Sequence, residues 1–224
     1  EIGSGLVGSE MCIRDSFGGL AVYRYSKIPV SLPLASEETS LYPGKRMARL
    51  ITPSGETVLL DTLRQTDTQQ MKLHNDQGRV VIQAACGDAN GDQPVYHCLE
   101  VPRGGEFSFL LPDSTTVFLN AESRLRFPDR FVPGSERIVY LSGEAYFDVK
   151  RDPRSPFLVC LEHSAVKVTG TSFNVKAYPD DTNEATTLIS GTVSMGIGTT
   201  EQWIVLKPGE QGYYCLLYTS PSPR

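Results

Sequence analysis

Two carboxylates, Glu144 and Asp148, come nearest to catalytic chemistry in their type and spacing. They lie four residues apart in a segment where apolar and polar residues alternate, and Asp152 follows them. An even spacing on a strand places both side chains on one face, and glycoside cleavage uses a pair of carboxyl groups. Acids that face solvent are ordinary on strands, however, and no aromatic platform for a sugar is obvious around these acids. We therefore predict no catalytic residue.

Metal-binding patterns are weak. The three histidines lie far apart with no paired-ligand spacing: His74, His97 and His163. Solvated or hydrogen-bonded histidines are the favoured interpretation. The loop at residues 88–92 (DANGD) offers oxygen ligands at alternate positions, but its glycine comes too early for a calcium loop, and Leu99 stands where a bidentate Glu is needed. We predict no metal site and no cofactor.

The residues between 137 and 178 indicate strands that would carry these acids. One apolar set alternates with polar residues and consists of Ala145, Phe147, Val149, Val166, Val168, Phe173, Val175 and Ala177. Period-two alternation is typical of half-buried strands. Gly143 and Gly170 interrupt the pattern where a bulge or tight bend is expected. The only Trp, Trp203, is expected to anchor the last core strand.

The whole chain favours an all-β fold. No segment shows a convincing helical period, and residues 61–78 are polar enough to predict a loop with a short helical turn. From residue 101 to 214 strands recur at regular intervals, separated by turn sequences. The predicted architecture is an irregular β-solenoid-like or sandwich-like stack of antiparallel hairpins.

An internal echo supports a repetitive architecture. The segment Pro43–Thr62 aligns without gaps to Pro102–Ala121, and both are typical of a hairpin with a Pro-containing polar turn. A chance match between two unrelated hairpins is the competing explanation.

Composition limits the classes of partner. Net charge is −5 with both signs interspersed, so no basic stripe indicates nucleic acid as a partner. Cys86 and Cys98 flank a polar loop that a disulfide could close, and Cys160 is left over. Spacing alone does not establish a disulfide, and small, partly buried thiols are the favoured interpretation.

Six segments, in order, resemble the FecR family, the periplasmic sensor and anti-sigma regulators of bacteria, in the version found in Bacteroidetes-type organisms. They are Val101–Pro128, Leu141–Val149 (LSGEAYFDV), Pro156–Val159 (PFLV), Val168–Tyr178 (VTGTSFNVKAY), Thr186–Val193 (TTLISGTV) and Leu206–Gln211 (LKPGEQ). The family usually has Asp-Gly in its first hairpin, where this chain has Asp113-Ser114. The resemblance implies a twisted, solenoid-like β form.

The same resemblance implies partners and a location. A TonB-dependent outer-membrane receptor would present its signalling domain to the periplasmic part of the regulator. An extracytoplasmic-function sigma factor would then be freed from a cytoplasmic domain that is missing here. The expected location is the periplasm, tethered to the inner membrane by a missing or truncated span. A secreted carbohydrate-binding or polysaccharide-cleaving β protein is the alternative function.

We divide the chain on these grounds. Residues 1–16 and 215–224 resemble translated sequencing-adapter read-through and are excluded from fold reasoning. Residues 17–40 are expected to hold the outer end of a transmembrane segment and a juxtamembrane linker. Residues 41–100 then form an N-terminal β subdomain, and residues 101–214 form the FecR-like β domain.

Overall fold

The computed structural model describes residues 11–12, 21–22, 45–61, 71–76, 79–84, 94–197 and 203–215. Of the two predicted N-terminal segments, 1–16 and 17–40, only β1 (Met11–Cys12) and β2 (Ala21–Val22) are described, and they pair with each other. The predictions for the loop at 88–92 and for Cys86 lie outside the described residues. Cys215, placed in the excluded C-terminal segment, is the last residue of a strand.

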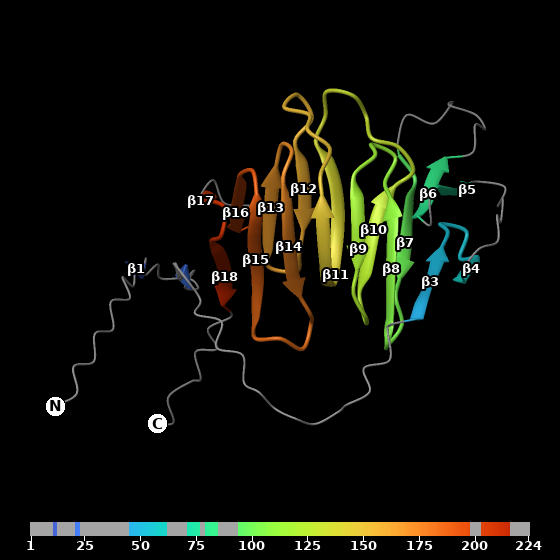
Figure 1. The fold of residues 1–224 in the computed structure, drawn as a ribbon, viewed down its shortest axis with the longest axis horizontal. Coiled ribbons are helices and arrows are strands. Elements are labelled where there is room, and N and C mark those ends of the chain that lie inside the picture. Colours follow the sequence, from blue (N-terminus) through green and yellow to red (C-terminus); the bar gives the residue numbers. More distant parts are fainter. Residues whose placement is uncertain are drawn as a thin grey trace.

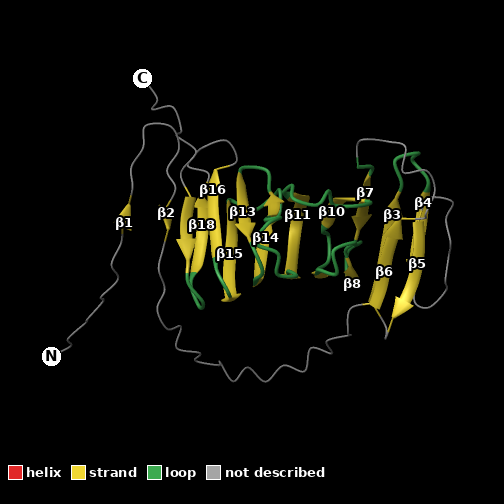
Figure 2. Ribbon diagram, turned by 90° about the horizontal axis from the view of Figure 1, so that it is seen from above, coloured by secondary structure: helices red, strands yellow, loops and turns green. Residues whose placement is uncertain are grey.

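The described residues contain strands and no helix, which confirms the all-β prediction (Figure 2). The strands of the main body are β3 (Lys45–Ile51), β4 (Thr57–Asp61), β5 (Met71–Asp76), β6 (Arg79–Ala84), β7 (Tyr96–Glu100), β8 (Gly105–Leu110), β9 (Thr116–Leu119), β10 (Arg124–Pro128), β11 (Arg137–Asp148), β12 (Phe157–Cys160), β13 (Ser164–Val168), β14 (Ser172–Ala177), β15 (Asn183–Ser190), β16 (Val193–Ile197), β17 (Trp203–Leu206) and β18 (Gln211–Cys215). Within the described part, no helix could span a membrane. The expected loop at 61–78 was partly wrong, because β5 occupies its second half and pairs with β6.

Two rows of strands face each other along the long axis of the molecule (Figure 1). The first sheet has the order β17, β16, β13, β12, β11, β10, β7, β3 and β4. The second sheet has the order β18, β15, β14, β11, β9, β8, β6 and β5. Most neighbours are antiparallel, but β12 runs parallel to β11, and β8 runs parallel to both β3 and β6.

Strand β11 belongs to both sheets. Its first half pairs with β10 and β12 in the first sheet, and its second half pairs with β9 and β14 in the second. Gly143 lies at the change-over with a φ of +105°, and a Cβ atom there would lie 2.5 Å from the Ser123 Oγ atom. Only glycine fits such a bend. Gly170 has a φ of +152° between β13 and β14, so both predicted bends are confirmed.

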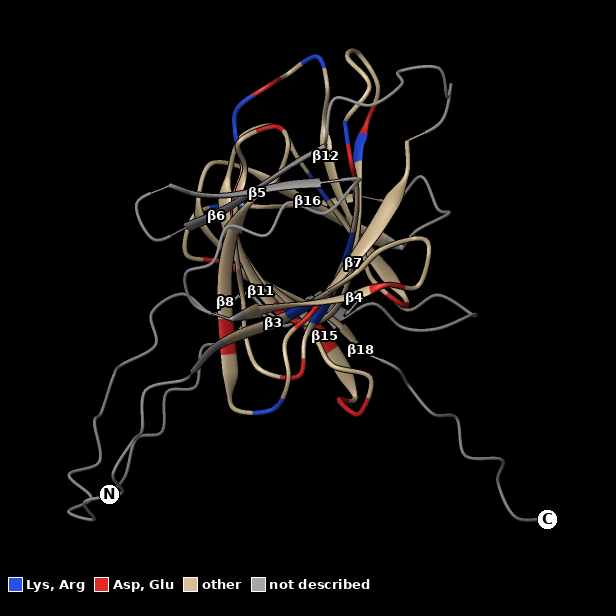
Figure 3. Cartoon of the chain, turned by 90° about the vertical axis from the view of Figure 1, so that its right-hand side faces the viewer, with Lys and Arg blue, Asp and Glu red and all other residues tan. Residues whose placement is uncertain are grey.

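One core lies between the two sheets, which close around it when the molecule is viewed end-on (Figure 3). Phenylalanines from both sheets meet there: Phe109 packs against Phe127 with ring centroids 5.5 Å apart, and Phe147 packs against Phe157 at 6.0 Å. The apolar residues predicted to face inward between 145 and 177 are all buried. The period-two interpretation of this segment is therefore confirmed.

The echoed segments form equivalent hairpins. In β3–β4 the turn is closed by Thr52 N donating to Glu56 O, and in β8–β9 by Leu111 N donating to Thr115 O, both at 2.9 Å. These positions correspond in the gapless alignment. The two hairpins also touch, because Lys45 of β3 pairs with Gly105 of β8. A repeated structural unit thus accounts for the echo.

Candidate functional site

Glu144 and Asp148 project from the same face of β11, as their spacing predicted, but each is held by neighbouring side chains. The Glu144 carboxylate accepts hydrogen bonds from Asn174 Nδ2 at 2.9 Å and from Asn120 Nδ2 at 3.1 Å. The Asp148 carboxylate accepts one from Ser172 Oγ at 2.8 Å. Both acids therefore act as acceptors on the outer surface of the second sheet.

The spacing of these acids does not suit glycoside cleavage. Four residues along a strand separate the Cα atoms by about 13 Å, whereas the two carboxyl groups of a glycosidase lie roughly 5–9.5 Å apart. Asp152 does not complete a pair, because its carboxylate accepts the backbone N–H of Arg154 in the following turn. The acids can bind hydroxyl or amide donors, but their geometry does not indicate hydrolysis.

Two aromatic rings, which the sequence analysis missed, lie beside Glu144. Phe118 of β9 is paired with Tyr146 of β11, and their ring centroids are 5.8 Å apart on the outer surface. With Glu144 and its two asparagines they line a groove of about 300 Å³. Phe118 lies in the uninterrupted run TTVFL, which has no alternation to show which face each residue takes.

The histidines do not converge. His97 is buried, and burial lowers its pKa, although nearby Asp129 acts in the opposite direction. His163 stacks on Tyr214 at the other end of the molecule, with ring centroids 6.0 Å apart. His74 belongs to β5. Among the residues with described side chains, no group of three His, Cys, Asp or Glu side chains could hold a metal ion.

Near the C-terminal end, Ser164, His163 and Glu184 are the residue types of a catalytic triad, but their connections differ from one. The Ser164 hydroxyl donates to Glu184 Oε2, and His163 Nδ1 lies 3.4 Å from Glu184 Oε1. In a triad the serine donates to the histidine, and the carboxylate holds the other ring nitrogen. Here the serine hydroxyl and the histidine ring both contact the carboxylate, so the serine has no base to activate it as a nucleophile. The cluster instead links β15 to the start of β13.

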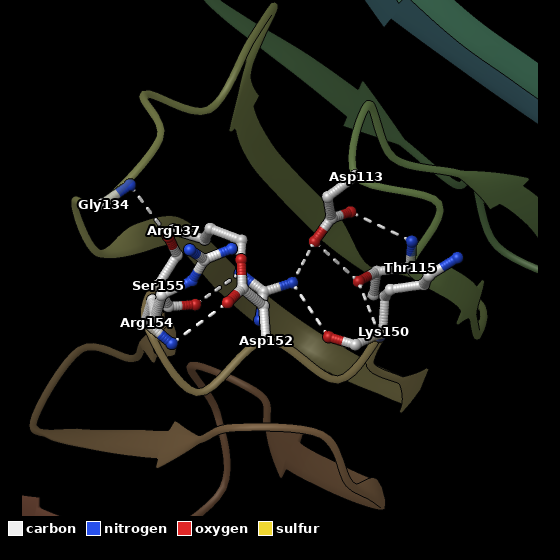
Figure 4. Close-up of polar contacts among 8 residues, drawn as sticks. All are labelled: Asp113, Thr115, Gly134, Arg137, Lys150, Asp152, Arg154 and Ser155. Carbon is white, nitrogen blue, oxygen red and sulfur yellow. Dashed lines mark hydrogen bonds and ion pairs between the residues drawn. The ribbon is translucent and has the colours of Figure 1, made fainter.

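A buried guanidinium, that of Arg137, links the β8–β9 turn to the loop between β11 and β12 (Figure 4). It forms an ion pair with Asp113 in the β8–β9 turn, and its Nε donates to Ser155 O at 2.8 Å. Its Nη1 also donates to Lys150 O at 3.1 Å. The Asp113 carboxylate in turn accepts from the backbone N and the hydroxyl of Thr115. Asp113 thus fixes its own turn and, through Arg137, the neighbouring loop.

The described thiols are unpaired. Cys98, Cys160 and Cys215 are free, and burial raises the pKa of both Cys98 and Cys160. Strands β10 and β11 separate Cys98 from Cys160, a distance of roughly 14 Å that is too long for a disulfide. For Cys98 the interpretation as a partly buried thiol is confirmed.

Both sheets end in strands from the C-terminal part of the chain. β17 pairs only with β16, and β18 pairs only with β15 among the described strands. The prediction that Trp203 anchors the core was wrong: its side chain is 36% exposed on the outer face of β17, and Val205 beside it is 52% exposed. Leu206 fills the core from this strand instead.

Comparison with known proteins identifies the central part of this body. Residues 98–194 match the model of the family described as FecR protein. This part of the chain belongs to the FecR family. The FecR domain begins in β7 and ends in β16, so it contains Glu144, the Arg137 network and all of β11. The match confirms the family resemblance, whose last segment, Leu206–Gln211, lies beyond the matched residues.

Two solved structures are similar to the chain that contains this FecR domain, each described as a "putative anti-sigma factor" from Parabacteroides distasonis. One is 38% identical, with a TM-score of 0.49, over 52% of this chain and 54% of that chain. The other is 39% identical, with a TM-score of 0.48, over 51% of this chain and 52% of that chain. The chain thus spans about half the length of these proteins. No curated protein matches it.

Proposed function

We propose that this chain is the β-sheet body of the periplasmic part of a membrane-tethered FecR-like regulator. In this role it relays a signal from a TonB-dependent outer-membrane receptor to an extracytoplasmic-function sigma factor. The FecR match over residues 98–194 is the observation that carries the proposal. The sigma factor is contacted by a cytoplasmic domain, and the membrane by a span, both outside the described residues.

The arrangement of the side chains supports a binding role. The acids of β11 are engaged by Asn and Ser side chains, and Ser164 donates to a carboxylate rather than to a base. Relay of a signal needs two surfaces held at a fixed separation, and one continuous core between two sheets provides that rigidity. The proposal therefore assigns no catalytic step to this body.

The last strands are the proposed contact for the receptor's signalling domain or for the next domain of the regulator. An edge strand presents unpaired N–H and C=O groups, which an added strand can bind. Trp203 and Val205 add exposed apolar surface beside the edge of β17. Trp203 also lines a hollow of about 410 Å³, together with Leu158, His163, Lys167 and others.

A binding experiment tests the proposal. The chain is titrated with the purified signalling domain of the TonB-dependent receptor that the proposal expects to be encoded beside it, and its Val205→Lys variant is compared with Ile189→Lys. Both positions are 52% exposed, but Val205 lies on edge strand β17 and Ile189 on β15, which has a neighbour on each side. A lysine on an edge opposes strand addition, so we expect weaker binding for Val205→Lys and unchanged binding for Ile189→Lys.

Two results contradict the proposal at different levels. Equal binding by both variants would show that β17 is not part of the contact with the receptor. Absence of any sigma-factor or receptor gene beside this gene, together with no binding by the unmodified chain, would overturn the relay function itself.

A further inference from the structure

The outer face of the second sheet carries a groove that the relay function does not use. It lies across β8, β9, β11 and β14 and has a volume of about 300 Å³. This volume is at the lower end of the range for small-molecule sites, roughly 300–1,000 Å³. Its lining includes Ser108, Phe118, Asn120, Glu144, Tyr146 and Asn174.

The aromatic residues give the groove an apolar floor. Phe118 is 41% exposed and Tyr146 is half-buried, and their rings meet at an interplanar angle of 56°. The face of an aromatic ring carries partial negative charge. It therefore attracts the C–H groups that line one side of a sugar ring. Glu144, weighed earlier as an acid without a sugar platform, has such a platform beside it.

The polar residues are fixed in advance. Each oxygen of the Glu144 carboxylate accepts one asparagine amide, from Asn174 or Asn120, and Asn120 Oδ1 accepts the backbone N–H of Ala121 at 2.8 Å. An ionised carboxylate has about four lone-pair sites, so Glu144 retains acceptor capacity for a ligand. Planar groups held in this way can bind neighbouring hydroxyl groups without a further loss of side-chain freedom.

Charge decides which saccharides fit. Glu106 and Glu144 line the groove, and its lining contains no Lys or Arg among the described residues. Lys176 is opposite Glu144 in the neighbouring strand, but it forms an ion pair with Asp181 at 2.8 Å. A sulfated or uronic-acid chain would be repelled by the two glutamate carboxylates. The groove therefore favours a neutral, hydroxyl-rich ligand.

From this combination we propose that the groove over β9 and β11 is a binding site for a neutral saccharide. Phe118 and Tyr146 stack against the sugar ring, and Glu144 with Asn174 accepts and donates hydrogen bonds to its hydroxyl groups. The site is separate from the β17 edge, so its occupation does not depend on the relay function. The proposal is for binding alone, because both oxygens of the Glu144 carboxylate already accept asparagine amides.

Affinity gel electrophoresis with a panel of soluble polysaccharides tests the site, using a β-glucan, an α-glucan, a xylan and a mannan, with an acidic alginate as the charged comparison. The full chain is compared with Tyr146→Ala, which removes a platform ring, and Ser108→Trp, which fills the groove. The control is Tyr140→Ala, because Tyr140 is likewise a tyrosine of β11 with its ring on the surface, 41% exposed, but lies on the outer face of the first sheet. Circular dichroism melting curves identify any variant that fails to fold.

We expect at least one neutral polysaccharide to retard the chain. Tyr146→Ala should weaken that binding about tenfold, the size of a lost aromatic contact. Ser108→Trp should abolish the binding, and Tyr140→Ala should keep it. If Tyr146→Ala is unfolded, Asn174→Ala replaces it and is expected to weaken binding. No retardation by any neutral polysaccharide, retardation by alginate alone, or equal binding by all folded variants would overturn the site.

Discussion

Gly55 and Ser114 occupy the same position in two equivalent hairpin turns, and both have a positive φ, +82° and +67°. In each turn their backbone N–H donates to the carbonyl of the residue three places earlier, Thr52 or Leu111, at 2.9 Å. Glycine adopts this conformation without strain, whereas an L-residue such as serine pays a steric cost. The second hairpin therefore keeps the turn with a residue poorly suited to it.

Ser114→Gly should consequently stabilise the fold. Removing the left-handed strain gains about 1–2 kcal/mol, and the greater freedom of glycine in the unfolded chain offsets roughly 0.5–1 kcal/mol of it. We expect the free energy of unfolding in urea to rise by up to about 1 kcal/mol. The reverse change in the other hairpin, Gly55→Ala, should destabilise. A stability loss in Ser114→Gly would mean that the serine side chain contributes a contact of its own.

The buried ion pair between Arg137 and Asp113 predicts a large loss of stability when only its carboxylate is removed. Asp113→Ala leaves the buried guanidinium without its carboxylate, and breaking a buried pair in this way costs about 3–5 kcal/mol. Denaturant unfolding should therefore show a marked loss. The control is Glu136→Ala, which breaks the exposed pair with Lys167 at 2.7 Å and should cost no more than about 1 kcal/mol. Similar losses in both variants would contradict this assignment.

Gly143 gives a test of the shared strand. Gly143→Ala places a methyl group within 2.7 Å of three Ser123 atoms at a φ of +105°, so we expect a loss of several kcal/mol, on the order of 3. Gly134→Ala is matched in backbone conformation, with a φ of +79°, but has no atom within 4 Å of the added carbon. Its loss should be only about 1 kcal/mol. Thermal melting of the two variants separates the clash from the backbone strain.

His97 predicts a pH dependence. Burial lowers its pKa below the ordinary 6.5, so the folded chain holds this ring neutral while the unfolded chain takes up a proton more readily. Stability from His97 is complete above pH 6.5 and is lost as the pH falls from there toward the folded-state pKa, by at most about 1.4 kcal/mol per pH unit. The difference in unfolding free energy between pH 7.5 and pH 5 should be smaller in His97→Phe. An unchanged difference would show that other groups control this range.

Alternation in the sequence was sufficient to predict strands and their inward faces where polar residues separate apolar ones. It also indicated that Arg137 is buried, because Arg137 lies an even number of residues from Val139 and Leu141, which face inward from β11. Alternation could not predict which side of its strand Trp203 or Phe118 occupies, because each lies in a run where apolar and polar residues do not alternate. Pairing partners were not predictable either. Ala145 contacts Leu119 and Val175 because the chain returns on both sides of it, and a local pattern contains no information on such distant neighbours.

The direction of the strands determines how this body responds to tension. They lie across the long axis (Figure 1), so a pull that separates β4 and β5 at one end from β17 and β18 at the other acts along the interstrand hydrogen bonds. Such a load breaks the bonds of one strand at a time, starting at an outermost strand, rather than all of them together in shear. The terminal hairpins should therefore peel away at low force, while β11, held in both sheets, resists until last.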